Sequence, residues 1–224
     1  MSPRLWIIDP SRFHPEGQGV EQILAEWPGT SRLFRPALVP GDGPGPDTGY
    51  ETDGVVLMGS ASSVYDEDPW IAPLASWLGP LLRGVPRIPL LGLCFGHQLI
   101  AHLAGGRVGF VAPDRSKIVG VERTRMAGGR LLPGEQTLHV VASHCEEVKR
   151  APPGYVVTAR RPNAPIDGLE HRDLPVFSFQ FHPEAREEFA TRCGIDLRRI
   201  DDRLRADSQR LLSAFRSRVH AATS

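Results

Sequence analysis

The chain has 224 residues, which fits one large domain or two small ones with a sizeable apolar core. Lys plus Arg and Asp plus Glu each count 26, so the formal net charge is zero and no basic excess indicates binding to nucleic acid or to an anionic membrane. No apolar run approaches the ~20 residues of a membrane span, and the N-terminus lacks a secretion-signal pattern. The three cysteines lack metal-type pairing and are typical of free thiols, so we expect a cytoplasmic protein without a metal or another cofactor.

Apolar runs and helical patterns alternate through the first half of the chain. The run at residues 5–9 is apolar on both faces, which is typical of a strand in a parallel sheet that is covered on both sides. Because helical patterns separate such runs, the alternation predicts a parallel sheet with helices on both faces. The expected strands are 5–9, 31–39, 53–58 and 88–93, and the expected helices are 16–27, 70–82 and one that begins directly after residue 94.

After Gly105 and Gly106 the pattern changes to short strands joined by Gly/Pro turns, which predicts an antiparallel arrangement or a mixed extension of the same sheet. Apolar residues at helical spacing then predict an amphipathic C-terminal helix at about 197–222. No linker divides the chain. We therefore expect one α/β domain over residues 1–224, a flavodoxin-like three-layer sandwich whose mostly parallel central sheet has an antiparallel extension in the second half. The strands expected in this half are 107–111, 117–123, 137–143, 155–160 and 176–181.

The strand at residues 88–93 runs directly into a helical pattern through a turn with the spacing Gly-x-Cys-x-Gly. So tight a turn forces Cys94 into a strained backbone conformation, and Gly92 and Gly96 leave the room that it needs. The Phe95 amide at the start of the helix can stabilise a thiolate or an oxyanion. We interpret Cys94 as a nucleophile whose side chain is exposed at the carboxyl edge of the sheet; the alternative is a buried core cysteine.

A cysteine nucleophile needs a base, and the base needs an orienting carboxylate. His182 follows the last predicted strand of the sheet, and Pro183 stiffens the turn that leaves this strand. Glu184, two residues beyond the histidine, can return to the other imidazole nitrogen. The alternative is a surface histidine at the start of a helix, where a glutamate is favoured anyway. Together with the cysteine turn, the catalytic interpretation is favoured.

Four stretches of the chain combine such residues in one order: 56–66 (VLMGSASSVYD), 92–98 (GLCFGHQ), 143–148 (SHCEEV) and 181–184 (FHPE). Together they resemble the class I (triad) glutamine amidotransferases, and in particular the glutaminase domain of GMP synthetases and its stand-alone relatives. The first stretch resembles the family's oxyanion-hole loop, and the third resembles its Ser-His-x-Asp-x-Val substrate segment. The resemblance covers about residues 4–190, which is nearly the whole chain.

The resemblance implies hydrolysis of the side-chain amide of glutamine. Cys94 would attack the amide carbon, His182 would take the thiol proton and deliver it to the leaving ammonia, and Glu184 would orient the imidazole ring. The resulting thioester would be hydrolysed to glutamate. By the same resemblance, amides of Gly59 or Ser60 and of Phe95 would form the oxyanion hole, and Gln98, Ser143 and His144 would bind the amino-acid end of the substrate.

The chain departs from the family pattern at two places. Ser60 and Ala61 stand where the family commonly has a second Gly and a Pro. The substitution affects the conformation of the loop more than the oxyanion-hole amide, because a backbone donor does not depend on its side chain. Glu146 stands where Asp is usual. No synthetase domain follows the glutaminase motifs in this sequence, so we expect the acceptor of the ammonia in a separate partner subunit.

Other functions remain open at this level. A free-standing hydrolase would use the same residues on γ-glutamyl peptides or amides, and a catalytically silent interaction module would share the fold. The intact Cys94, His182 and Glu184 argue against the silent module. An α/β-hydrolase with a cysteine nucleophile has the order nucleophile, acid, base, whereas the acid available here follows the base.

Overall fold

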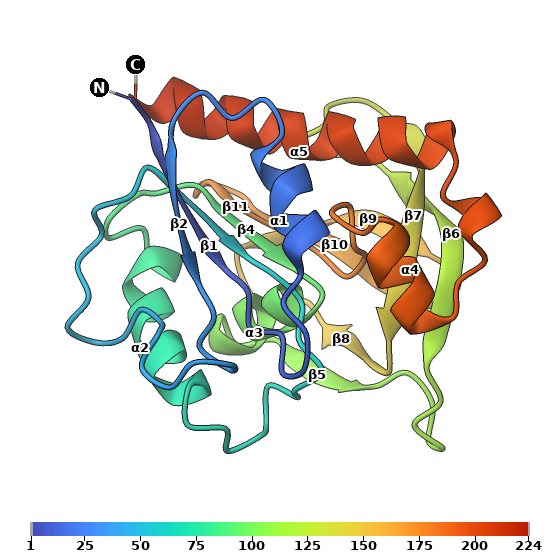
Figure 1. Ribbon diagram of the computed structural model, residues 1–224, viewed down its shortest axis with the longest axis horizontal. Coiled ribbons are helices and arrows are strands. Elements are labelled where there is room, and N and C mark those ends of the chain that lie inside the picture. Colours follow the sequence, from blue (N-terminus) through green and yellow to red (C-terminus); the bar gives the residue numbers. More distant parts are fainter. Residues whose placement is uncertain (1, 224) are drawn as a thin grey trace.

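The computed structural model describes residues 2–223 of the chain. Its main sheet has nine strands (Figure 1). From one edge to the other, its strands are β2 (Thr30–Phe34), β1 (Arg4–Ile8), β3 (Gly54–Leu57), β4 (Leu90–Leu93), β11 (Val176–Phe179), β10 (Ala164–His171), β9 (Tyr155–Arg161), β6 (Ile118–Met126) and β7 (Gln136–His144). The pairings from β2 to β11 are parallel, and those from β11 to β7 are antiparallel. The predicted α/β fold, a parallel sheet with an antiparallel extension in the second half, is confirmed.

Helices cover both faces of the parallel half because its strands are apolar on both faces. Trp6 and Ile8 of β1 belong to one apolar cluster, together with residues of α2 and α3. Leu5 and Ile7 belong to a second cluster on the other face, together with residues of α1 and α5. Figure 1 shows α5 along one side of the sheet and α2 on the other. The helices are α1 (Gly17–Leu24), α2 (Ile71–Leu82), α3 (Phe95–Leu103), α4 (Glu187–Cys193) and α5 (Asp202–Thr223), with a short 3-10 helix η1 (Leu197–Arg199) before the last.

Three elements of the second half were not predicted from the sequence. β8 (Glu146–Arg150) pairs with β5 (Arg107–Phe110) in a separate two-stranded sheet, and its sequence EEVKR lacks the apolar alternation of a typical strand. β10 has register shifts on both sides of Gly168, which interrupt its alternation. α4 has seven residues, too few to show a helical period.

Two predicted elements differ from the structure in their bounds more than the others do. The strand expected at 31–39 ends at Phe34, because the carbonyl of Arg35 accepts hydrogen bonds from the Leu38 and Val39 amides (3.1 and 2.9 Å) in a turn. The C-terminal helix expected at 197–222 is divided into η1 and α5. The Asp201 carboxylate accepts a hydrogen bond from the Leu204 amide (2.9 Å), which is a helix N-cap and starts a new helix at this point.

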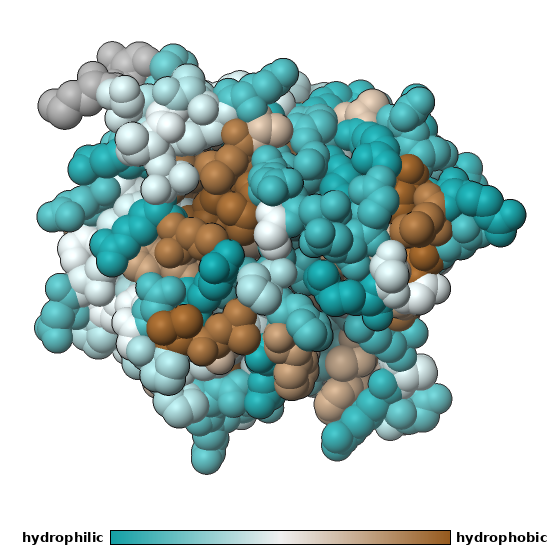
Figure 2. All heavy atoms as spheres, viewed as in Figure 1, coloured by the Kyte–Doolittle hydropathy of each residue, from teal (hydrophilic) through white to brown (hydrophobic). Residues whose placement is uncertain are grey.

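The surface seen in Figure 2 is largely hydrophilic, and its hydrophobic side chains lie in separate patches. Between residues 2 and 223, no helix has both the length and the apolar character needed to cross a membrane.

The turn between β4 and α3 is packed so closely that glycine is required on both sides of it. A side-chain carbon on Gly96 would lie 2.3 Å from the carbonyl oxygen of Leu57 on the neighbouring β3. A side-chain carbon on Gly92 would lie 2.7 Å from the Gly96 carbonyl group and 2.5 Å from Ile100. Because most of these atoms belong to the backbone of packed elements, they cannot move aside at low cost. The two glycines therefore set how closely α3 approaches the sheet.

We predict that Gly96→Ala lowers the free energy of unfolding by about 3 kcal/mol or more, since overpacking against rigid backbone costs about 1–3 kcal/mol even where neighbours can adjust. Gly17→Ala is the matched control, because nothing lies within 4 Å of the carbon that it adds, and it should change stability by less than about 0.5 kcal/mol. Urea unfolding followed by circular dichroism measures both. Equal stability of the two variants would show that the contact with Leu57 is not restrictive.

Candidate active site

Cys94 lies at the apex of the turn between β4 and α3, with φ 51° and ψ −102°. For a residue other than glycine this backbone conformation is strained, and the surrounding hydrogen bonds maintain it. The Cys94 amide donates to the carbonyl of Phe179 on β11 (2.8 Å), and the Cys94 carbonyl accepts from the Gln98 amide (3.0 Å). The strain predicted from the Gly-x-Cys-x-Gly spacing is therefore present.

The expectation that the Cys94 side chain is exposed is wrong, because only 5% of the residue is accessible. The reason is that three neighbouring segments cover the turn. Residues 11–14 and 16 before α1, residues 59–61 after β3, and Ser143 near the end of β7 line a pocket that contains Cys94. The thiol is thus accessible only through the pockets that it lines.

His182 lies in the same pocket, three residues beyond the end of β11, and is 4% exposed. Its amide donates to the Val141 carbonyl of β7 (2.9 Å), which fixes the backbone of the turn. Its Nδ1 lies 2.8 Å from Oε1 of Glu184, which is itself 2% exposed. A carboxylate only accepts hydrogen bonds, so Nδ1 carries the proton and Nε2 is left as the basic nitrogen.

The electrostatic surroundings of His182 favour its charged form. Burial lowers the pKa of His182, but the negative charges of a Cys94 thiolate and of Glu184, together with their hydrogen bonds, outweigh burial and raise this pKa well above its usual value. A thiolate beside an imidazolium is the reactive form of a cysteine nucleophile.

Gly59 approaches both of these residues. A side-chain carbon built on Gly59 would lie 2.8 Å from Cε1 of His182 and 3.4 Å from Cβ of Cys94. Among residues 2–223, the Gly59 and Ser60 amides donate no hydrogen bond, and the Phe95 amide is in the first turn of α3, where an intrahelical acceptor does not exist. Unused amides close to the thiol are suited to an oxyanion.

Ser60, which departs from the family pattern, is held in place by its own side chain. The Ser60 hydroxyl donates to the Pro10 carbonyl (2.7 Å) and accepts from the Ser62 amide (3.1 Å). These bonds connect the loop after β3 to the segment before α1. The hydroxyl therefore supplies a constraint on the loop that a glycine at this position lacks.

Gln98 and Gln180 join α3 to the strands around Cys94. The Gln98 side-chain amide donates to the Glu146 carbonyl (2.7 Å) and to Oε1 of Gln180 (3.2 Å). Gln180 in turn places its Nε2 3.6 Å from the Cys94 sulfur. Sequence analysis expected Gln98 near the substrate but gave Gln180 no role. The signal was available, because Gln180 and His182 are two residues apart and extended residues at this spacing face the same side.

His144 is buried with both ring nitrogens engaged. Its Nδ1 lies 3.0 Å from the Glu146 carbonyl, and its Nε2 lies 3.1 Å from a guanidinium nitrogen of Arg161. Arg161 is paired with Asp167 (2.8 Å), and both side chains are fully buried. Burial and the positive charge of Arg161 lower the pKa of His144 to about 3, so the ring is neutral, with its proton on Nδ1. The ring fixes the segment that follows β7, and both of its nitrogens are already hydrogen-bonded within the protein.

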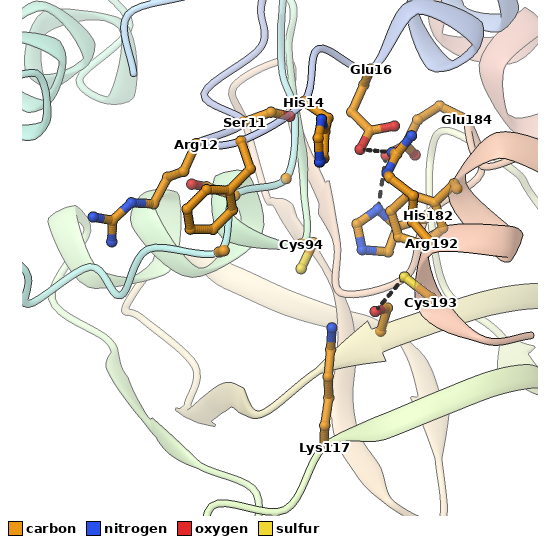
Figure 3. A pocket seen from close by; sticks show the side chains of 16 residues that line it. Ser11, Arg12, His14, Glu16, Cys94, Lys117, His182, Glu184, Arg192 and Cys193 are labelled. Carbon is orange, nitrogen blue, oxygen red and sulfur yellow. Dashed lines mark hydrogen bonds and ion pairs between the residues drawn. The ribbon is translucent and has the colours of Figure 1, made fainter. Parts of the chain in front are cut away.

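Cys94 is at the junction of two pockets. The one on the His182 side has a volume of about 160 Å³ and contains Glu184, His14 and Glu16, as Figure 3 shows. The one on the Gln98 side has a volume of about 310 Å³. It is lined by Ser60, Ala61, Ser62, Ser63, Asp66, Cys94, Gln98, Phe110, Lys117, Ser143, His144, Cys145 and Glu146. All nine residues that sequence analysis placed at the site, except the buried Phe95, thus line one pocket or both.

Metal ligation is not suggested by this arrangement. Within residues 2–223, no group of three or more His, Cys, Asp or Glu side chains could hold a metal ion.

The family model described as "Glutamine amidotransferase class-I" matches residues 32–191, which include Cys94, His182 and Glu184. The chain belongs to this family. Its fold agrees with that of a glutamine amidotransferase from Methylobacillus flagellatus, with a TM-score of 0.76 over 99% of this chain and 95% of the other, at 21% sequence identity. The family resemblance read from the four motifs is therefore confirmed.

Two relatives are similar in sequence. The chain is 38% identical over 117 residues to one subunit of the glutamine-hydrolyzing GMP synthase of Pyrococcus abyssi, and the match covers 48% of this chain and 61% of that protein. It is 38% identical over 147 residues to the glutamine-hydrolyzing GMP synthase of Gibberella zeae, and that match covers 62% of this chain and 25% of the other protein. The similarity thus spans only part of the length of each relative.

We predict that iodoacetamide at about pH 6.5 labels Cys94 faster than Cys145 or Cys193, although Cys94 is the most buried of the three. This pH is well below the ordinary thiol pKa of about 8.5, so only a thiol that a neighbouring cation holds as a thiolate reacts quickly. His182→Gln should slow labelling of Cys94 by about tenfold or more. The other two cysteines serve as internal controls and should keep their rates. Mass spectrometry of the modified peptides measures each rate, and a Cys94 rate that is independent of residue 182 would contradict the ion pair.

Proposed function

We propose that this chain hydrolyses the side-chain amide of glutamine through a thioester on Cys94 and releases ammonia to a separate synthetase subunit. The observation that supports this most directly is the meeting of Cys94, in its strained turn, with the hydrogen-bonded pair His182 and Glu184 in one pocket of a class I amidotransferase fold. Nucleophile, base and orienting carboxylate are the three parts that covalent amide hydrolysis needs.

In the acylation step, the thiol proton of Cys94 moves to Nε2 of His182 and the sulfur bonds to the amide carbon of glutamine. The amide oxygen becomes an oxyanion. The unused amide of Gly59 or Ser60, on one side of the thiol, and the Phe95 amide, on the other, donate to it. The carbon–nitrogen bond then breaks as the nitrogen takes the proton from His182 and leaves as ammonia. The acyl group remains on sulfur as a thioester.

In the deacylation step, His182 removes a proton from water, and the resulting hydroxide attacks the thioester carbon through the same oxyanion geometry. The carbon–sulfur bond breaks, glutamate leaves, and Cys94 is restored by the proton on His182. Glu184 takes no proton at either stage. It keeps the Nδ1 proton in place and stabilises the imidazolium that forms twice in the cycle.

The amino-acid end of glutamine fits the pocket on the Gln98 side, whose volume of about 310 Å³ exceeds that on the His182 side. Ser143 lies at the junction of the two pockets, and its hydroxyl is 3.2 Å from the sulfur of Cys193. His144 and Gln98 shape the pocket wall, since the polar atoms of the His144 ring and the Gln98 amide nitrogen are already hydrogen-bonded within the protein.

The separate synthetase is proposed because several similar proteins, from Pyrococcus and Thermococcus species, carry names that describe one subunit of a glutamine-hydrolyzing GMP synthase. In these relatives, the similarity lies in one subunit rather than in a whole synthase. Ammonia released in a pocket at the carboxyl edge of the sheet would then reach an acceptor bound across this edge.

A second candidate function is hydrolysis of γ-glutamyl peptides or amides without a partner. The pocket on the His182 side favours it, because the leaving nitrogen departs towards His182. A volume of about 160 Å³ is several times the ~30 Å³ that one water-sized molecule occupies in the liquid. A substituent on the leaving nitrogen would therefore have room.

We predict a graded loss of amide hydrolysis in the three proposed catalytic residues. Cys94→Ala and His182→Ala should each lower kcat by on the order of 10⁶-fold, whereas Glu184→Ala should lower it by on the order of 10⁴-fold, because the orienting member of such a triad costs less to remove. Glutamate release measures the three rates, and circular dichroism controls for folding. A folded Glu184→Ala variant as inactive as Cys94→Ala would contradict the orienting role.

Comparison of donors distinguishes the two candidate functions. For a partner-dependent amidotransferase, we expect the isolated chain to hydrolyse glutamine slowly, to leave γ-glutamyl peptides intact, and to become faster when its synthetase is added. Product release from glutamine and from a panel of γ-glutamyl peptides is measured with Cys94→Ala as the blank. Hydrolysis of a γ-glutamyl peptide at about ten per second, the typical rate of an efficient enzyme, without any partner would favour the second function.

A further inference from the structure

A cavity of about 550 Å³ lies away from Cys94, where the ends of α2 and α3 meet the strands β9 and β10. Its lining includes Arg83 directly after α2, Leu103 at the end of α3, Tyr155 at the start of β9 and His171 at the end of β10. α3 begins beside Cys94 and has nine residues, so about 13 Å of helix separates its two ends. The cavity is therefore distinct from the pockets that contain the thiol.

The Tyr155 hydroxyl is a buried donor without a partner. The residue is 7% exposed, and within residues 2–223 no group is hydrogen-bonded to its oxygen. Burial raises the pKa of Tyr155, so the proton stays on the hydroxyl. An unpaired buried polar group is destabilising, and native structures contain few of them. A ligand in the cavity that Tyr155 lines would supply the missing acceptor.

His171 offers a second donor at the same place. Its Nδ1 accepts hydrogen bonds from the Asp173 and Leu174 amides (3.0 Å each), so the ring proton is on Nε2. Burial, together with the positive charges of Arg130 and Arg87, lowers the pKa of His171, which keeps the ring neutral at neutral pH. The His171 ring meets the ring of the buried tyrosine edge-on, with centroids 4.9 Å apart. The two donors thus belong to one wall of the cavity.

Positive charge dominates the surroundings of this cavity. The Arg83 guanidinium makes no hydrogen bond or ion pair within residues 2–223. Arg87 and Arg130 act on the His171 ring from nearby, and one acid, Asp173, opposes them. None of the described residues that line the cavity is acidic. The ligand that fits such a set of donors and charges is an anion.

The carboxyl ends of α2 and α3 do not oppose an anion here. A helix end of this kind disfavours negative charge when its last carbonyl groups are free. In this protein, the carbonyls of Pro80 and Leu81 accept hydrogen bonds from the amides of residues 83–85. Those of residues 100–102 accept from the amides of residues 104–106. These acceptors are therefore already used within the two turns.

We propose that this cavity binds an organic anion, a carboxylate or a phosphate monoester with an apolar body. The Arg83 guanidinium pairs with the anionic oxygens, and the Tyr155 hydroxyl and Nε2 of His171 donate to them. Leu82 and Leu103, which also line the cavity, contact the apolar part of the ligand. The site lies at the far end of α3 from the thiol. It goes beyond the proposed function and does not depend on it.

The test is a titration of ¹⁵N-labelled protein, followed by the NMR shifts of its backbone amides. Cys94 is first alkylated with iodoacetamide, which blocks the catalytic pockets. Phenyl phosphate and benzoate are the two anionic probes, benzyl alcohol has the ring without the charge, and inorganic phosphate has the charge without the ring. We expect saturable shifts at residues 83, 103, 155 and 171, with a Kd on the order of 1 mM for at least one of the two anionic probes. The tighter of these two probes identifies the acid group that the site prefers. Benzyl alcohol and inorganic phosphate should bind about tenfold or more weakly.

Three variants separate a built site from general attraction. Arg83→Gln should weaken binding of the tighter probe by about tenfold or more, because it removes a charge-assisted pair. Tyr155→Phe should weaken it by about fivefold. In the absence of a probe, the same variant should keep or raise the thermal unfolding midpoint, since it removes an unpaired buried hydroxyl. Arg172→Gln is the matched control, because it removes the same charge beside His171 from an exposed side chain outside the cavity, and it should change the Kd by less than about threefold.

Four results would overturn the proposal: no saturable shift with either anionic probe, shifts confined to residues around Cys94, benzyl alcohol binding as tightly as the anions, or equal weakening by Arg83→Gln and Arg172→Gln. A thermal midpoint lowered by several degrees in Tyr155→Phe would also contradict it, because the hydroxyl would then be paired in the free protein. Glutamine hydrolysis by the unmodified chain is measured separately. Its absence would contradict the proposed function alone, since probe binding is measured on protein that cannot turn over.

Discussion

The parallel pairing of β4 with β11 is the constraint on which the site depends. Parallel neighbours end at the same edge of a sheet, so the turn after β4 and the extended segment after β11 leave the edge side by side. A hydrogen bond from the Cys94 amide to the Phe179 carbonyl fixes the position of the turn after β4 relative to the end of β11. Gln180 and His182, 86 and 88 residues further along the chain, can then face the thiol. β3 ends beside β4 on the other side, and thus Gly59 reaches the same point.

Three buried histidines around this edge differ in charge because their partners differ. His97 lies between the Ser178 hydroxyl and the Ile166 carbonyl, and burial lowers its pKa to about 4. His144 lies beside the Arg161 guanidinium, which disfavours a second cation. Only His182 is next to anions, and its pKa rises. The residue type sets none of these states; burial, the neighbouring charges and the hydrogen-bond partners decide in which ring the charged form is favoured.

The sequence predicted those features of the molecule that depend on residues close to one another in the chain. The apolar run before Cys94, the glycines that flank it and the two-residue spacing of His182 and Glu184 depend on short-range sterics, and they indicated the turn and the pair correctly. The burial of Cys94 could not be predicted, since the segments that cover it come from distant parts of the chain. The position of Lys117 could not be predicted for the same reason, because only the folded sheet brings the residue before β6 to the pockets that contain Cys94.

The hydrogen bond from Ser60 to the carbonyl of Pro10 has a mechanical consequence. It connects the loop that carries the free Gly59 and Ser60 amides to the segment that leads into α1. Asp9 stiffens this segment further, because its carboxylate accepts from the Ser11 hydroxyl and from the Glu16 amide. The two loops therefore form one rigid wall of the pocket, and a displacement of residues 10–16 by any molecule that presses on them would shift the donor amides together with it.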